Sequence, residues 1–391
     1  MWPYVVCFSL SCLFTGAAGR CKRKKKIYAA LVFSVLALLL PCLLAAFRDN
    51  TVGSDVLVYG DAFYEYSLKM GFWDFVTSRN KGYLFMLLVY LCSHTVETKT
   101  FYYFVIQAFV VVPVYAALQK DEANRYAWFG MLVYYLFFYA YTLNLMRQSI
   151  AVALLFWGFK FVRGKKPVKY LILVGICMLF HTTAIVGIVV YPIYVLTCPE
   201  AEFRVRKVTV KTHRNLAAEK FIRKYNSVIS WIIIAATVLV LTQYDRIVLI
   251  LYKLDPESWA HFYQGIFLSS LGIIWIYVIL VAPVFIMYLI NRKYYNKADK
   301  DIQPLFVMSL MAVILFQSAT ISAETYRVSL YLHLFIIPFT MKLLRYKRRL
   351  SKRLGWMALI AVCLIMFWCY FFAYEGWNSV YPYTSSLLGI G

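Results

Sequence analysis

Charged residues are scarce in this sequence: they make up 15% of its 391 residues, whereas 62% are hydrophobic. That is too little charge for the surface of a soluble protein of this size. The apolar runs are continuous and near membrane length, without the alternation that β-barrel strands show. We therefore predict an all-α integral membrane protein, residues 1–391 forming a single polytopic bundle of about twelve spans plus one re-entrant or short helix.

Several common site signatures are also missing. The nine cysteines include no Cys-x-x-Cys pair and mostly lie within apolar runs, which favours buried thiols over a disulfide or zinc framework. The five histidines do not cluster, and we predict neither a metal site nor a cofactor. No internal repeat is visible, which counts against transporter folds built from inverted repeats.

Basic residues outnumber acidic ones, 41 to 18, and most of them lie in short connections. Examples are Arg20–Lys26, Arg163–Lys169, Lys342–Arg353 and the longer insert 198–226. Loops this rich in Lys and Arg are typical of the cytoplasmic side. We therefore predict that they face the cytoplasm and contact anionic membrane lipids, and that the net charge of +23 reflects no binding of nucleic acid.

This sidedness places residues 48–80, with an amphipathic helix, and the loop 243–267 on the exoplasmic face. The apolar run 83–93 is too short for a normal span, which favours a re-entrant or partial helix. A full crossing is the alternative, but it would move the basic turn 163–169 outside. The arms 170–180 and 183–197 are also short and meet near His181.

In this topology, the ionisable residues set into or beside the apolar runs all face one exoplasmic cavity. Such residues are costly in hydrocarbon and usually mark a functional site. Three are arginines, whose forked donors suit phosphate and pyrophosphate. The alternative is that each arginine reaches lipid headgroups or pairs with a nearby acid, as Arg48 could with Asp49. The six residues are Arg48, Asp55, Arg147, His181, Glu324 and Arg327.

Five short motifs on this polytopic background resemble the EpsG family of bacterial polysaccharide polymerases, relatives of the Wzy-type O-antigen polymerases. Each motif is weak alone, but their order and spacing over residues 48 to 383 are fairly specific. The motifs are Arg48 through Gly53-Ser54-Asp55-x-x-x-Tyr59, Arg147-Gln148-x-Ile150-Ala151, Phe180-His181-Thr182-x-Ala184, Tyr326-Arg327-x-x-x-Tyr331 and Tyr381-Pro382-Tyr383.

The resemblance implies a glycosyltransferase of the bacterial inner membrane with a fold similar to the GT-C enzymes. Its substrate would be an undecaprenyl-pyrophosphate-linked oligosaccharide, polymerised into exopolysaccharide, capsule or O-antigen. A chain-length regulator or a flippase is an implied protein partner. The insert 198–226 is longer than the family leads us to expect.

Transfer from a lipid pyrophosphate needs one base for the acceptor hydroxyl and cations for the leaving group. Asp55 lies in the first exoplasmic loop, where GT-C enzymes place an essential acid, and the pKa of a histidine such as His181 is close to ambient pH. The resemblance does not assign the two roles. We favour Asp55 as the base, with His181 orienting the acceptor. Otherwise Asp55 is a loop cap or a partner of Arg48, and His181 bonds a helix carbonyl.

The same motifs supply candidate sugar-binding residues. Aromatic faces stack on sugars, although many aromatic residues of membrane proteins simply form belts at the interface. The candidates are Tyr59, Gln148, Tyr326, Tyr381 and Tyr383, together with Glu324, which lies two residues before the Tyr326 motif.

Two other functions are compatible with a polytopic chain. A flippase for lipid-linked oligosaccharides also needs cationic cavities, but it must expose charge to both faces, whereas here the intramembrane charge is predicted on one. An acyltransferase acting on the polymer would need a His-Asp type of pair and access to a cytoplasmic acyl donor.

Overall fold

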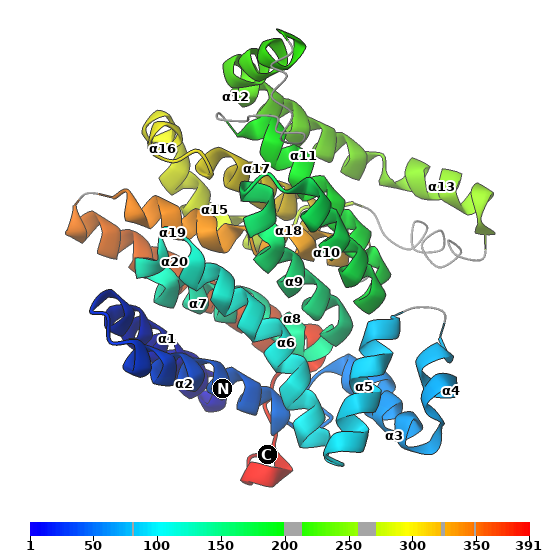
Figure 1. Ribbon diagram of the computed structural model, residues 1–391. Helices are drawn as coiled ribbons and strands as arrows, with labels where there is room; N and C mark the ends of the chain where they lie inside the picture. Colours follow the sequence, from blue (N-terminus) through cyan, green and yellow to red (C-terminus); the bar gives the residue numbers. More distant parts are fainter. Residues whose placement is uncertain (80–81, 199–212, 257–270, 322–324, 348) are drawn as a thin grey trace. The chain divides into compact units, whose positions relative to one another are not determined.

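The computed structural model describes residues 1–79, 82–198, 213–256, 271–321, 325–347 and 349–391 (Figure 1). Within these ranges every regular element is a helix, and only an isolated bridge between Ser385 and Ile390 has β geometry. The all-α prediction is confirmed for this part of the chain. Helices suit such apolar runs because each satisfies its backbone hydrogen bonds within its own segment.

Seven helices are long and apolar enough to cross a membrane, or eight if the bent pair α15–α16 is one broken span. The protein is therefore a multi-pass membrane protein, while the count of about twelve spans stays a prediction. Three apolar helices are shorter: Tyr83–Thr95, Pro167–Phe180 and Thr182–Thr197. The seven are Trp2–Arg23, Ile27–Ala46, Lys99–Lys120, Lys224–Thr242, Ile302–Thr320, Thr325–Arg345 and Leu350–Tyr374.

Residue contacts divide the chain into two compact units. The first unit contains Met1–Lys160, Val168–Ile185 and Thr340–Gly391, and the second contains Phe161–Pro167 and Val186–Phe339. The sequence-based division into one membrane domain with an amphipathic exoplasmic loop, a basic insert and a second exoplasmic loop stays a prediction. Residues 199–212 of the insert and 257–267 of the second loop lie outside the described residues.

The first unit begins with a hairpin of two long helices, α1 (Trp2–Arg23) and α2 (Ile27–Ala46), joined by the basic turn. They lie side by side in Figure 1, with α6 (Lys99–Lys120) against α2 and α7 (Ala127–Tyr134) against α1. The last long helix of this unit is α20 (Leu350–Trp368), which continues as a π-helix over Cys369–Tyr374.

Between α2 and α6 the chain forms short elements. A π-helix (Val56–Asp61) is followed by α3 (Ala62–Lys69), α4 (Phe72–Thr77) and α5 (Tyr83–Thr95). The 13 residues of α5 rise about 20 Å, less than the roughly 30 Å of a hydrocarbon core. The predicted short helix is confirmed, while its re-entrant placement stays a prediction.

Two breaks position the motif residues of the first unit. After a π-helix (Tyr135–Tyr139) and α8 (Ala140–Asn144), the non-helical Leu145 separates α8 from α9 (Met146–Arg163). Similarly, α10 (Pro167–Phe180) ends immediately before His181, and a 3-10 helix (Thr182–Val189) follows. The predicted interruption at His181 is confirmed.

The second unit packs around α17 (Ile302–Phe316), which contacts α11 (Val190–Thr197), α12 (His213–Thr242) and α18 (Leu330–His333). The axis bends by 73° between α15 (Trp275–Leu289) and α16 (Arg292–Ala298). Its other elements are α13 (Tyr244–Leu254), 3-10 helices at Gln317–Thr320 and Thr325–Ser329, and the start of α19 (Ile336–Arg345).

Candidate active site

Arg147, in the first turn of α9, lies among aromatic rings. Its guanidinium carbon is 5.0 Å from the ring centre of Tyr59, 5.7 Å from that of Phe63 and 6.0 Å from that of Phe85. Phe63 and Phe85 are buried, as is the neighbouring Gln148, whereas Arg147 itself is half-buried. Such rings hold a cation without neutralising it. No described carboxylate forms an ion pair with Arg147, so its donors are available to an anion.

A glycine brings Arg147 close to the end of α10. Gly82 precedes α5 with φ of 79°, in the left-handed region. A Cβ placed there would lie 3.4 Å from the carbonyl oxygen of Phe180 and 3.8 Å from Nη1 of Arg147. His181 follows Phe180, and its Nδ1 is 2.7 Å from Oγ1 of Thr183. The chain at His181 and the guanidinium of Arg147 thus approach the same glycine.

Asp55 is held by the end of α8. The side-chain oxygen of Asn144 accepts hydrogen bonds from the backbone N–H of Asp55, at 2.6 Å, and from the hydroxyl of Ser54, at 3.1 Å. Asp55 is half-buried and immediately precedes the π-helix that carries Tyr59. Because Tyr59 contacts Arg147, one short stretch places both the carboxylate and one wall of the arginine site.

The loop before Asp55 requires a glycine. Gly53 has φ of 113°, and its N–H donates to the carbonyl of Ser379 in the C-terminal tail. A Cβ at this position would lie 2.8 Å from the carbonyl oxygen of Leu143. Backbone with this φ is strained for any other residue, so the loop and the tail are locked together at Gly53.

Arg48 differs from Arg147 because its donors point into the protein. It is 7% exposed, and its Nη1 donates to the carbonyl of Leu143 at 2.6 Å. Its guanidinium carbon is 5.1 Å from the ring centre of Tyr103, and burial lowers its pKa from the usual value. Asp49, the acid expected as its alternative partner, accepts from the N–H of Ser386. These contacts are those of an internal arginine that fixes the loop.

An acidic network that the sequence analysis overlooked lies beside Arg48. The hydroxyl of Tyr103 donates to Asp61 at 2.6 Å, and the ammonium of Lys99 lies 3.3 Å from the same carboxylate and 3.0 Å from that of Glu65. Asp61 and Glu65 are four positions apart in the amphipathic stretch 48–80. Lys99 and Tyr103 belong to another helix further along the chain, so no local sequence pattern indicates this network.

A second overlooked residue is Arg79, whose guanidinium carbon lies 4.6 Å from the ring centre of Phe63. Phe63 therefore contacts two arginines, Arg79 and Arg147. Arg79 is exposed and lies shortly before α5, so the candidate site has a second cation that no family motif marked.

The C-terminal tail folds back on the first loop. Tyr383 is 4% exposed, its hydroxyl donates to the carbonyl of Leu44 at 2.9 Å, and burial raises its pKa to about 12. The N–H of Asp49 donates to the carbonyl of Thr384. Tyr381 is 37% exposed. Of the two tail tyrosines predicted to bind sugar, Tyr381 offers more accessible surface.

The remaining predicted site residues belong to the second unit. Arg327 is half-buried in the 3-10 helix Thr325–Ser329, and Tyr326 is buried with its ring centre 5.4 Å from that of Phe316. Glu324 lies outside the described residues. The contact described for Tyr326 is therefore with a residue of the second unit, to which Arg327 also belongs.

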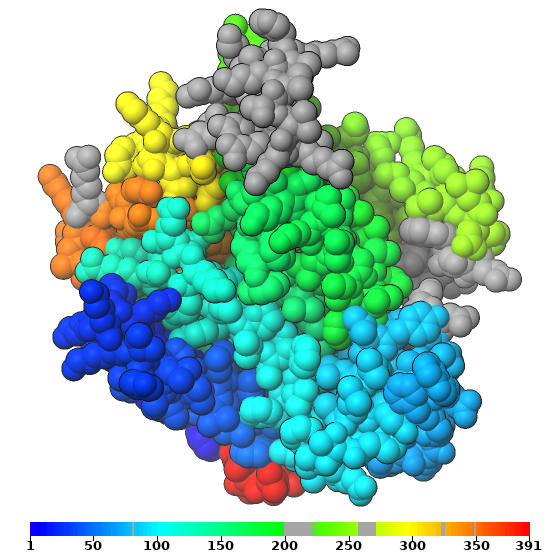
Figure 2. Space-filling model, in the orientation of Figure 1, coloured from blue at the N-terminus to red at the C-terminus, as the bar shows by residue number. Residues whose placement is uncertain are grey.

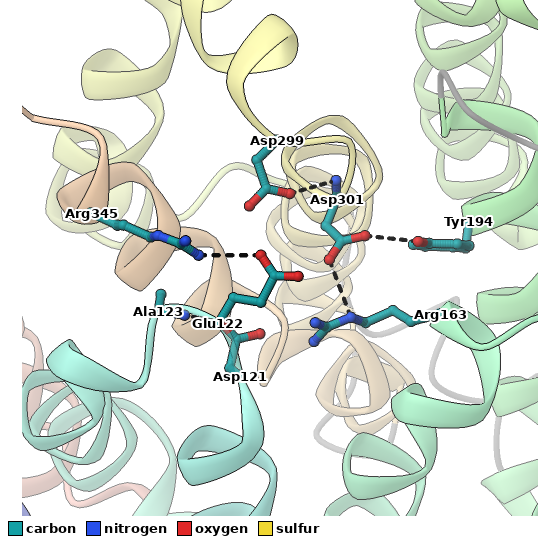
Figure 3. Close-up of polar contacts among 8 residues, drawn as sticks. All are labelled: Asp121, Glu122, Ala123, Arg163, Tyr194, Asp299, Asp301 and Arg345. Atoms are coloured by element: carbon teal, nitrogen blue, oxygen red, sulfur yellow. Dashed lines mark hydrogen bonds and ion pairs between the residues drawn. The ribbon is translucent and has the colours of Figure 1, made fainter. Parts of the chain in front are cut away.

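The prediction of no metal site assumed that the sequence has no Asp-x-Asp pair, and that assumption was wrong, because Asp299-Lys300-Asp301 is one. Asp301 accepts from the hydroxyl of Tyr194 at 2.7 Å and pairs with Nε of Arg163 at 3.1 Å (Figure 3). Asp299 accepts from the backbone N–H of Asp301. The pair thus ties the start of α17 to protein groups, and no cluster of three His, Cys, Asp or Glu occurs among the described residues.

Figure 3 also shows a separate ion pair in the first unit, between Arg345 and Glu122, with a distance of 3.2 Å. Beside it, the carboxylate of Asp121 accepts from the N–H of Ala123 at 2.8 Å and shapes the turn between α6 and α7. Both Arg345 and Glu122 are exposed enough for this pair to add little stability.

The chain matches a known protein family over most of its length. The model of a family described as the EpsG family aligns with residues 31–200 and 218–385. No curated protein and no solved structure matches the chain.

Proposed function

This chain belongs to the EpsG family of polysaccharide polymerases, and we propose that it joins lipid-linked oligosaccharide repeat units at the exoplasmic face of a bacterial inner membrane. The proposed carrier is undecaprenyl pyrophosphate, and the product is an exopolysaccharide, a capsule or an O-antigen. The matched residues include Arg48, Asp55, Arg147 and His181.

The observation that carries this proposal is the environment of Arg147. A pyrophosphate that leaves a sugar takes an electron pair, and its negative charge must be stabilised. Arg147 offers a forked donor held by three aromatic rings and paired with no described acid. An arginine that served only to stabilise the fold would donate to protein groups, as Arg48 does to the buried carbonyl of Leu143.

In the proposed step the acceptor hydroxyl attacks the anomeric carbon of the growing chain. A new carbon–oxygen bond forms, the bond to the pyrophosphate breaks, and the hydroxyl proton passes to a base. We choose Asp55 as the base because it is a carboxylate whose charge interacts favourably with Arg147, on the short stretch that also carries Tyr59 of the arginine site. His181 then orients the acceptor or a phosphate oxygen. Because cations alone stabilise the leaving group, we propose that transfer requires no metal.

The arginines have different proposed roles. Arg147 contacts the pyrophosphate, and Arg79, whose guanidinium also lies over Phe63, is a candidate for its second phosphate. Arg48 holds the loop that bears Asp55. Arg327 is proposed as a further phosphate ligand from its motif alone.

The test is a reconstituted reaction. The purified chain in lipid nanodiscs receives synthetic undecaprenyl-pyrophosphate repeat units with a radiolabelled sugar, and products are separated by length. We expect a ladder of products and release of undecaprenyl pyrophosphate in proportion to the bonds formed. A chain that moves units across proteoliposome membranes without lengthening them would be a flippase. One that only acylates added polymer would be an acyltransferase.

A further inference from the structure

A basic cavity of about 960 Å³ lies in the second unit, on the side opposite to that of the motif residues in the predicted topology. It is formed where α15 ends, where α16 and α17 begin and near the start of the candidate span Lys224–Thr242. The bend of 73° between α15 and α16 opens this space, because it turns the chain away from the span axis. None of its lining residues belongs to the proposed polymerisation site.

The lining carries positive charge. It includes Arg292, Lys293 and Lys297, and none of its described residues is an acid. The next acids along the chain, Asp299 and Asp301, are buried, and Asp301 pairs with Arg163. The three cations are therefore available for an anionic ligand, and both lysines are exposed.

One wall of the cavity is built from ordered polar groups. Gln303 is 2% exposed and accepts from the side chain of Asn296 at 3.0 Å, while it donates to Ser230 at 2.7 Å. Arg292 donates to the hydroxyl of Ser227, and its guanidinium carbon is 5.6 Å from the ring centre of Trp231. The chain thus fixes Arg292 in place before any ligand arrives, which lowers the entropy cost of binding.

Exposed aliphatic side chains lie beside the cations, and a water-soluble anion would not need them for binding. Leu289 and Ile290 line the same cavity and are 51% and 63% exposed. They end the apolar helix α15, where a membrane span meets the headgroup region. Exposed aliphatic side chains beside cations match a molecule that has both acyl chains and a phosphate.

We propose that this cavity binds the phosphate headgroup of an anionic phospholipid, with Lys293, Lys297 and Arg292 facing the phosphate and Leu289 and Ile290 against the acyl chains. This lipid site is independent of the polymerisation reaction. A bound lipid would connect α12, α15 and α16 at the membrane surface and stabilise the second unit there.

The test titrates a fluorescent phosphatidylglycerol into the full-length protein held in phosphatidylcholine nanodiscs. The variant Lys293→Gln/Lys297→Gln removes two exposed charges and keeps both side chains polar, so the fold should be retained. We expect it to bind the lipid roughly tenfold to thirtyfold more weakly than the parent, because each lysine near an anionic lipid contributes about 1 kcal/mol. Lipid retained during purification, measured by native mass spectrometry, should fall in parallel.

The matched control is Lys166→Gln/Lys169→Gln, which removes the same charge from exposed residues of another predicted cytoplasmic turn. It should bind the lipid as the parent does. If both double variants bound the lipid equally weakly, the loss would reflect general surface charge and the proposed site would be wrong. Unchanged lipid binding by Lys293→Gln/Lys297→Gln would also overturn it. Displacement of the lipid by millimolar inorganic phosphate would assign the cavity to a free phosphate instead.

Discussion

The side-chain oxygen of Asn144 accepts a hydrogen bond of 2.6 Å from the backbone N–H of Asp55. The nitrogen of the same amide donates to Asn378 at 2.9 Å, 234 positions further along the chain. One side chain at the end of α8 therefore ties the loop that carries the proposed base to the C-terminal tail.

We expect Asn144→Ala to lower both stability and turnover. It leaves the N–H of the half-buried Asp55 without its acceptor, at a cost of about 1–3 kcal/mol. Denaturant unfolding and the polymerisation rate measure the two effects. Asn378→Ala is the control, since it breaks the bond to the tail and keeps the one to Asp55. An equal loss of turnover in both variants would mean that the tail, rather than Asp55, is what Asn144 positions.

Arg147→Lys should reduce turnover roughly tenfold to a hundredfold while expression stays normal. The lysine keeps the charge but loses the fork, and a charge-assisted hydrogen bond contributes about 1.5–3 kcal/mol. Product length in the reconstituted reaction measures this loss. Arg125→Lys, an exposed arginine in the turn between α6 and α7, serves as the matched control and should leave the products unchanged. Parental ladders from Arg147→Lys would assign Arg147 to lipid headgroups.

The two candidate bases are separated by a pair of variants. Asp55→Asn removes the proton acceptor and should abolish transfer while donor binding persists, whereas His181→Gln keeps hydrogen-bonding capacity and should retain a measurable rate. Turnover is measured for each variant as a function of pH. If Asp55→Asn retained the parental transfer rate and His181→Gln were inactive, we would assign the role of base to His181.

The loop before Asp55 should tolerate no side chain at its glycine. Gly53→Ala forces a Cβ against the carbonyl of Leu143 at a φ of 113°, at a cost of about 1–3 kcal/mol. Gly175→Ala, at an open position within α10, should instead stabilise the protein by about 0.5–1 kcal/mol. Thermal unfolding of both variants measures the contrast. Equal stabilities would show that the loop relaxes around the added methyl group.

Topology can be mapped with single cysteines in a cysteine-free background. We expect cysteines at Ser54 and Ser386, both exposed, to react with an impermeant reagent added outside the cell. Cysteines at Lys24, Lys166 and Lys297 should react only after the membrane is opened, because basic loops stay in the cytoplasm. Labelling of Lys166→Cys from outside would show that α5 crosses the membrane, and would place Arg147 and His181 on the cytoplasmic side.

The sequence patterns predicted where helices form, but they did not predict which residues contact one another in the candidate site. The short apolar run 83–93 indicated α5, and the polar His181 marked the break after α10. The motifs gave Arg48 and Arg147 the same expected role. In the structure, however, Arg48 bonds a buried carbonyl and Arg147 faces aromatic rings.

The membrane-helical class follows from local sequence, because a helix in lipid satisfies its hydrogen bonds within one segment and each apolar run therefore specifies its own structure. Which arginine has donors available for a ligand depends instead on tertiary packing. That choice depends on rings from three separate elements converging on Arg147, and on a carbonyl 95 positions away from Arg48. Contacts between residues so distant in the chain follow from how the helices pack, and no local pattern encodes them.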